Sequence, residues 1–119
     1  MTDLPAVFTA LNQIMRPYAA HLVCLADNDS ELSLETSHIQ KNKKPLWFGG
    51  VQVKKNYVSY HLMPVYVNPQ LLADLSPGLR KRMQGKSCFN FTAVDETLLA
   101  ELAELTAVAF QDYQRQGYV

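Results

Sequence analysis

The chain has 119 residues, of which 48% are hydrophobic and 18% are charged, and its 11 basic and 11 acidic side chains cancel. This length predicts a single domain over residues 1–119, large enough to fold without a metal or a disulfide. Because the chain is neutral and no apolar run approaches the roughly 18 residues of a membrane span, we expect no nucleic-acid or membrane partner.

Residues 3–18 (DLPAVFTALNQIMRPY) predict the first helix, because apolar side chains recur there at the spacing of one helical face. Thr2 or Asp3 is expected to cap its start, since a short side chain with an oxygen accepts a hydrogen bond from the first turn. Pro5 is tolerated within that turn.

Two strands are expected next, over the apolar run at 21–26 and over the alternating segment ELSLETSHI at 31–39, joined by the turn DNDS. In the second strand Leu32 and Leu34 face one way and are expected in the core. The polar residues between them face the other way, so that side should be wet.

The segment LWFGGVQVKKNYVSYHLMPVY at 46–66 predicts a β-hairpin with a tight turn around KKN. Two short helical pieces, each opened by a proline after a capping Asn or Ser, are expected within 67–83. A last strand (KSCFNF, 86–91) and a long amphipathic helix at 92–117 follow. A capping box of Thr92 and Asp95 is expected to start this helix, and Gly117 to stop it.

Short connections between consecutive strands favour antiparallel neighbours, and the long helices occur only at the two ends. The expected fold class is therefore α+β, with an antiparallel β-sheet of about five strands and the N- and C-terminal helices packed on one face. An exposed edge strand and a sheet face rich in tyrosine are compatible with either a monomer or a homodimer.

The strand around His61 has one apolar side and one mixed side. The apolar side is expected in the core: Val58, Tyr60 and Leu62. The mixed side combines aromatic, hydroxyl and imidazole groups, as the lining of a small pocket often does: Tyr57, Ser59, His61 and Met63. On the partner strand the pair Gly49 and Gly50 predicts a bulge or a close approach to the backbone.

We therefore expect a non-catalytic binding module that takes a small molecule or a protein partner on the His61 side. The segment 41–86 carries nine basic residues and one acid, and these either remain solvated or provide an anion site beside this face. The candidate binding residues are Phe48, Gln52, Tyr57, Ser59, His61, Lys86 and Asn90. Phe48 and Tyr57 would form walls, and Lys86 would pair with an anion. The alternative is a solvated sheet surface on which the histidine simply bonds a neighbour.

The two cysteines, Cys24 and Cys88, lie far apart without a CxxC spacing, which predicts reduced, buried thiols in a cytoplasmic protein. Cys88 would be a candidate nucleophile only if His61 lay beside it on one face, so an enzyme is the less favoured interpretation and no catalytic residue is assigned. No histidine or cysteine pair has a short metal-ligand spacing, and we assign no metal ligand and no cofactor.

Three segments together carry a family resemblance: WFGGVQVKKNYVSYHLMPVY, LSPGLRKRMQGKSCFNF and the closing amphipathic helix. They resemble the YdhG-like bacterial domains of unknown function over about residues 43–117. The most specific parts are KKNYVSYHLMP and GKSCFNF.

The resemblance implies one compact α+β domain, loosely similar to frataxin, and one member of that group has been considered an iron chaperone. Iron or metal handling is thus the alternative function. In frataxin-like proteins that role depends on an acidic patch, which lies largely on the first helix and the adjoining strand. The acids available here are Asp3 on the first helix and Asp27, Asp29, Glu31 and Glu35 farther along.

Overall fold

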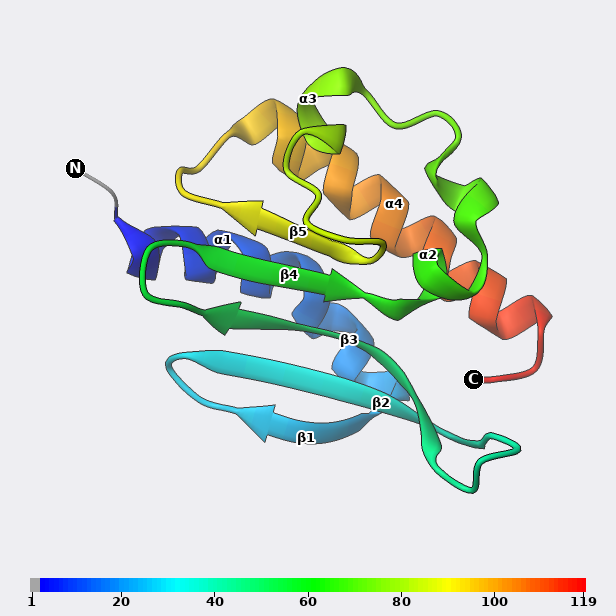
Figure 1. The fold of residues 1–119 in the computed structure, drawn as a ribbon. Helices are drawn as coiled ribbons and strands as arrows, with labels where there is room; N and C mark the ends of the chain where they lie inside the picture. The colour runs from blue at the N-terminus through cyan, green and yellow to red at the C-terminus, as the bar shows by residue number, and fades with distance from the viewer. Residues whose placement is uncertain (1–2) are drawn as a thin grey trace.

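A computed structural model describes residues 3–119 (Figure 1). Thr2, one of the two residues expected to cap the first helix, lies outside this range. The elements in chain order are α1 (Leu4–Met15), the 3-10 helix η1 (Arg16–His21), β1 (Val23–Asp27), β2 (Glu31–Ile39), β3 (Pro45–Val53), β4 (Val58–Leu62), α2 (Met63–Val67), the 3-10 helix η2 (Pro69–Leu72), α3 (Pro77–Arg80), β5 (Cys88–Phe91) and α4 (Glu96–Arg115). The five strands form one antiparallel sheet in the order β1-β2-β3-β4-β5, so the expected α+β class is confirmed.

Helix α1 begins where the Asp3 carboxylate accepts a hydrogen bond from the Ala6 N–H at 3.1 Å, which confirms Asp3 as a cap. Pro5 lies in the first turn, where its missing N–H leaves no hydrogen bond unmade. The helix is shorter than expected, because the chain tightens into η1 at Arg16. Pro17, the next residue, has no N–H to continue the α-helical ladder.

Both long helices pack on the same face of the sheet, and Figure 1 views the sheet from the opposite side, with α1 behind β3 and β4. Phe48 of β3 lies edge-on to Phe110 and Tyr113 of α4, with ring centroids 5.8 and 5.9 Å apart. On β4 the Tyr60 hydroxyl contacts the Thr106 hydroxyl of α4 at 2.6 Å. The expected core side of β4 is confirmed as fully buried: Val58, Tyr60 and Leu62.

A β-bulge in β3 decides which side chains share a face. Leu34 of β2 pairs with Gly49, but the next residue, Glu35, pairs with Trp47. Two residues of β3 therefore lie opposite one residue of β2, and Phe48 is the extra residue. The paired glycines thus accompany a bulge, as the sequence predicts.

The bulge reverses the alternation of side chains along β3. Phe48 and Gly49 both face the helices, and a Cβ on Gly49 would lie 2.9 Å from the Met15 side chain of α1. Trp47 and Gly50 face the uncovered side, where a Cβ on Gly50 would lie 3.2 Å from the indole ring. The expectation that Phe48 lies on the pocket side is therefore wrong, because strict alternation does not hold across a bulge.

Short helices fill the connection between β4 and β5. The strand β4 ends at Leu62, and Met63, expected on the strand, instead begins α2. Pro64 explains the difference, because proline fits the first turn of a helix but cannot donate to a strand ladder. The two expected helical pieces are η2 and α3, and the Ser76 hydroxyl caps α3 by accepting from the Leu79 N–H at 3.2 Å.

The last helix, α4, starts later than expected. Asp95 is itself the cap and accepts a hydrogen bond from the Leu98 N–H at 3.2 Å, so the capping box with Thr92 is wrong. Gly117 follows the helix with a φ of 81°, a left-handed conformation that glycine adopts without steric cost. The predicted stop at Gly117 is confirmed.

The two edges of the sheet differ. Beyond β5, Met83 bridges Phe89 and extends the pairing by one residue. Beyond β1 no further strand pairs within residues 3–119, and Val23, Cys24 and Leu25 are exposed. The expectation that Cys24 is buried is therefore wrong, because an edge strand at this position is not covered by the helices. Whether the chain is a monomer or a homodimer stays a prediction.

Candidate binding site

The uncovered face of the sheet carries two rows of mostly polar residues that cross from β2 to β5. The first row consists of Glu31, Gln52, Ser59 and Asn90. The second row lies beside it and consists of Ser33, Gly50, His61 and Cys88. Each residue is the register partner of the next, so neighbouring side chains in a row are within contact range. The pairing therefore places on one face Gln52, Ser59, His61 and Asn90, as the sequence predicts.

The Trp47 ring lies over part of the second row. Its Nε1–H donates to the Ser33 hydroxyl at 3.0 Å, and its ring centroid is 5.5 Å from that of His61. Gly50 makes room for the indole because it has no Cβ. Ser33, expected to be wet, is buried as a result. Strand alternation does not assign Trp47 to this face, although the paired glycines signal the bulge that brings it there.

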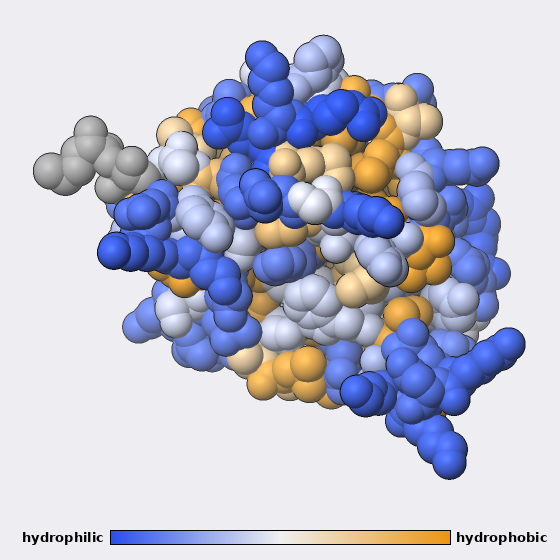
Figure 2. Space-filling view, viewed as in Figure 1, coloured by the Kyte–Doolittle hydropathy of each residue, from blue (hydrophilic) through white to orange (hydrophobic). Residues whose placement is uncertain are grey.

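A hollow of about 170 Å³ opens next to the indole, and its lining includes Glu31, Ser33, Trp47, Gly50, Gln52 and His61. Figure 2 shows this face of the molecule, with pale, weakly polar atoms near its middle, hydrophobic atoms below and to the right, and strongly hydrophilic atoms at the top, left and lower right. Pockets for drug-sized ligands measure roughly 300–1,000 Å³, so this hollow suits a smaller molecule. The side-chain amide of Gln52 has no hydrogen-bond partner within residues 3–119 and is available to a ligand.

The remaining predicted residues contribute less than expected. Ser59 is buried, and its hydroxyl donates to the Gln52 carbonyl at 3.4 Å. Tyr57 is half-buried in the hairpin turn before β4. Lys86, expected to pair with an anion beside the pocket, instead holds its Nζ 6.0 Å from the centre of the Tyr66 ring.

Lys54, rather than Lys86, is the cation whose charge acts on this face. Burial lowers the pKa of the His61 imidazole, and the Lys54 ammonium lowers it further. Burial raises the pKa of the Cys88 thiol, and the same ammonium opposes this rise. At neutral pH His61 is therefore a neutral imidazole and Cys88 a protonated thiol.

Cys88 and His61 lie side by side, as the enzyme hypothesis requires. The Cys88 Sγ is 3.9 Å from the His61 Nε2 and 3.4 Å from the Asn90 Oδ1. A nucleophilic cysteine also needs a thiolate, and a base held in place by a third group. Here the thiol is protonated and Asn90 contacts the thiol rather than the imidazole, so we assign no catalytic residue.

Cys24 is expected to react with a thiol reagent such as DTNB at least about tenfold faster than Cys88, because a raised pKa leaves less thiolate at Cys88. Two kinetic phases measured at pH 8 would check this. The Cys24→Ser variant should retain only the slow phase and Cys88→Ser only the fast one. Equal rates for the two thiols would contradict the half-buried position of Cys88.

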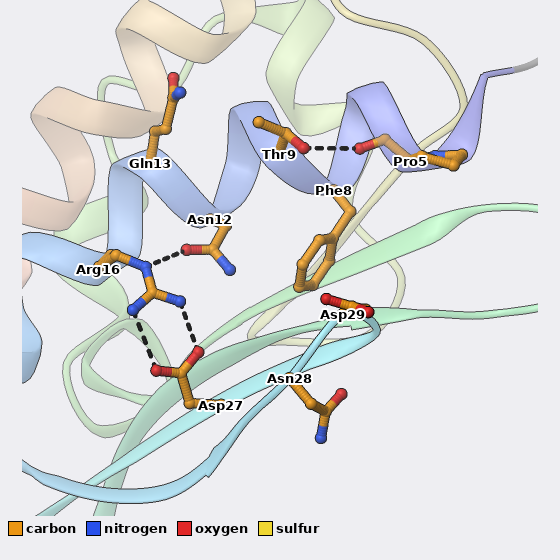
Figure 3. Close-up of a pocket in the computed structure, with 9 residues that line it drawn as sticks. All are labelled: Pro5, Phe8, Thr9, Asn12, Gln13, Arg16, Asp27, Asn28 and Asp29. Atoms are coloured by element: carbon orange, nitrogen blue, oxygen red, sulfur yellow. Dashed lines mark hydrogen bonds and ion pairs between the residues drawn. The ribbon is translucent and has the colours of Figure 1, made fainter.

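A larger groove of about 600 Å³ lies between α1 and the turn that joins β1 to β2 (Figure 3). Its polar groups are largely bound to one another. Arg16 donates two hydrogen bonds to the Asp27 carboxylate, at 2.6 and 3.1 Å, and one to the Asn12 side chain at 2.8 Å. The Thr9 hydroxyl donates to the Pro5 carbonyl at 2.9 Å. Few groups are left to converge on a ligand, so the hollow on the sheet is the better candidate despite its smaller volume.

The acidic residues considered for metal handling do not converge. The Arg16 guanidinium lowers the pKa of Asp27 by a direct hydrogen bond and thereby occupies its carboxylate. Glu31 and Glu35 lie on β2, beyond the turn that holds Asp29. Within residues 3–119, no group of three or more His, Cys, Asp or Glu side chains is arranged to hold a metal ion.

No protein-family model, curated protein or solved structure matches this chain. None of the helices over residues 3–119 combines the length and the apolar character that crossing a membrane requires.

Proposed function

We propose that the chain is a non-catalytic binding module that takes a small polar ligand, in the first instance a carboxylate or phosphate, in the hollow on the uncovered face of the sheet. The observation that carries this proposal is the hollow itself, which the Trp47 and His61 rings line together with the side-chain amide of Gln52, unpaired in the part of the chain that the structure describes. The rings give a ligand a flat contact, and the amide gives it hydrogen-bonding groups.

The charges around the hollow support an anion in preference to a cation. Lys54 places a positive charge close enough to act on His61 and Cys88. His61 is a hydrogen-bond donor in its neutral form, and the Gln52 amide adds two further N–H groups. Glu31 lies at the edge of the same hollow, which favours a ligand with one acidic group over a highly charged one.

The Lys54→Gln variant is expected to bind a small anion at least about threefold more weakly than the wild type, because it removes the positive charge that acts on His61. Lactate and inorganic phosphate are suitable probes, and the rise in melting temperature is the readout. At 100 times its dissociation constant a ligand adds about 2.7 kcal/mol to the free energy of unfolding.

Lys55→Gln is the matched control, because Lys55 is exposed in the same turn and acts on neither His61 nor Cys88. It should leave the shift unchanged, whereas His61→Ala should abolish it. If His61→Ala leaves both the stability and the binding of every probe untouched, the face is a plain solvated surface and the proposal is wrong.

We propose, further, that the chain is a cytoplasmic member of the YdhG-like domains. The α+β fold, an antiparallel sheet with helices against it, is the fold which that resemblance implies, and both cysteines are free thiols. The acidic residues do not converge, so we do not propose iron handling through them.

A further inference from the structure

The Cys88 sulfur lies close to two further donor atoms on β4 and β5 beside the hollow, and the binding of an anion does not involve this sulfur. Cys88 and His61 are register partners on adjacent strands, and Asn90 lies two residues from Cys88 on the same face. The Cys88 Sγ is 3.9 Å from the His61 Nε2 and 3.4 Å from the Asn90 Oδ1. A thiol has one proton, so it cannot donate to both neighbours at once.

We propose that Cys88, His61 and Asn90 form a binding site for one copper(I) ion. Thiolate sulfur and imidazole nitrogen are the protein donors that soft transition-metal ions prefer. Both side chains project from paired strands, so the backbone holds the two donors in position before the ion arrives.

The distances fit an ion held between the sulfur and the nitrogen. With metal–sulfur and metal–nitrogen bonds of about 2.3 and 2.0 Å, a sulfur–nitrogen separation of 3.9 Å closes to an angle of about 130° at the metal. With a metal–oxygen bond of about 2.1 Å, the 3.4 Å from sulfur to the Asn90 oxygen closes to about 100°. The wide sulfur–metal–nitrogen angle fits a low-coordinate ion better than a tetrahedral one.

The number of donors favours copper(I) over zinc. Structural zinc is held by four protein ligands, and zinc in a catalytic site by three. Within residues 3–119 no third His, Cys, Asp or Glu joins Cys88 and His61, so the site offers two strong donors and one weak amide oxygen. Copper(I) is stable with two or three ligands. On binding, the sulfur–copper bond replaces the S–H bond and the proton passes to solvent, and the copper stays in the +1 state throughout.

Lys54 distinguishes the copper(I) site from the anion site of the proposed function, because its charge has opposite effects on the two ligands. The copper(I) site is additional to that function. The Lys54 charge acts on both His61 and Cys88 and repels a cation there. Lys54→Gln should therefore tighten copper(I) while it weakens the binding of lactate or phosphate. Cys88→Ser should abolish the binding of copper(I) and leave the binding of lactate or phosphate unchanged, which a single shared site would not allow.

The test is a titration of the full chain with copper(I) under anaerobic conditions, in competition with a chromogenic copper(I) chelator. The wild type and Cys24→Ser should each bind one equivalent, because Cys24 is an isolated exposed thiol. Cys88→Ser should bind at least about 100-fold more weakly, since loss of even an outer partner of a metal ligand costs 10–100-fold. X-ray absorption should show one sulfur and two nitrogen or oxygen neighbours.

His61→Gln is a second variant that removes a donor without touching the thiol, and circular dichroism would establish that each variant is folded. The His61→Gln variant should also fail to bind the one equivalent of copper(I) that the wild type binds. The proposal is overturned if Cys88→Ser or His61→Gln binds copper(I) as the wild type does, or if Cys24→Ser loses it. The proposed function fails separately, if Lys54→Gln leaves the binding of lactate and phosphate unchanged.

Discussion

Replacement of Tyr60 with alanine is expected to lower the free energy of unfolding by about 3–5 kcal/mol, the cost typical of removing a large buried ring. Tyr60 lies in the middle of β4, is fully buried, and sits between the sheet and α4. Its replacement leaves a cavity that the surrounding strands and helices cannot fill. It also leaves the hydroxyl of Thr106 without its neighbour.

The Tyr60→Phe variant separates the ring from its hydroxyl. Thr106 donates its only hydroxyl proton to the Leu102 carbonyl at 2.8 Å, so Tyr60 is the donor in their mutual hydrogen bond. Loss of that one bond should cost about 1 kcal/mol. Urea denaturation of both variants would measure the difference. A cost below about 1.5 kcal/mol for Tyr60→Ala would be incompatible with a core position.

Replacement of Gly49 with alanine is expected to lower the free energy of unfolding by about 3 kcal/mol, at the upper end of the cost of overpacking a core. A Cβ at this position would collide with the His61 carbonyl oxygen, which belongs to the adjacent strand and cannot rotate away. It would also lie 2.9 Å from the Met15 side chain. Relief requires β3 and β4 to separate, at the cost of the ladder between them.

Gly78→Ala is the matched control, because it adds the same methyl group where there is more room. The nearest atom to its Cβ would be in the Leu98 side chain, at 3.2 Å, and a side chain can move. Gly78 also lies in α3, where alanine is favoured over glycine, so the change should stay within about 1 kcal/mol of zero. Thermal unfolding of the two variants checks the contrast, and similar losses for both would contradict it.

The fold could be predicted from the sequence because its signals are local. The alternation that starts at Glu31, the KKN turn and the proline-led pieces each determine their own conformation through nearby residues. The predictions that are wrong concern features that depend on how separate elements pack together. Cys24 lies in an apolar run but on an edge strand, and edge position depends on which strand pairs with which. Thr92 has the chemistry of a cap, yet Asp95 is the residue that lies next to the first turn.

The candidate site was only partly predictable, for one physical reason. Alternation assigns every second residue of a strand to the same face, and a bulge adds one residue to the strand. The side chains of β3 that precede the bulge therefore lie on the opposite face from the one that alternation predicts. Alternation therefore places Phe48 with the pocket and leaves out Trp47, whereas Gln52, after the bulge, lies on the same face as His61, as alternation predicts. Sequence spacing does not single out Lys54 among the basic residues, because the reach of a long side chain over the sheet depends on the twist of the hairpin.

The order of the sheet has a consequence for synthesis of the chain. Each strand pairs with the one before it, so the sheet can assemble step by step as the strands leave the ribosome, through contacts between near neighbours that form quickly. Helix α4 (Glu96–Arg115) follows every strand, yet it covers Phe48 and Tyr60. Until α4 emerges, the nascent sheet presents those rings to water. That interval, rather than pairing of the strands, is the stage at which we expect the chain to aggregate or to need a chaperone.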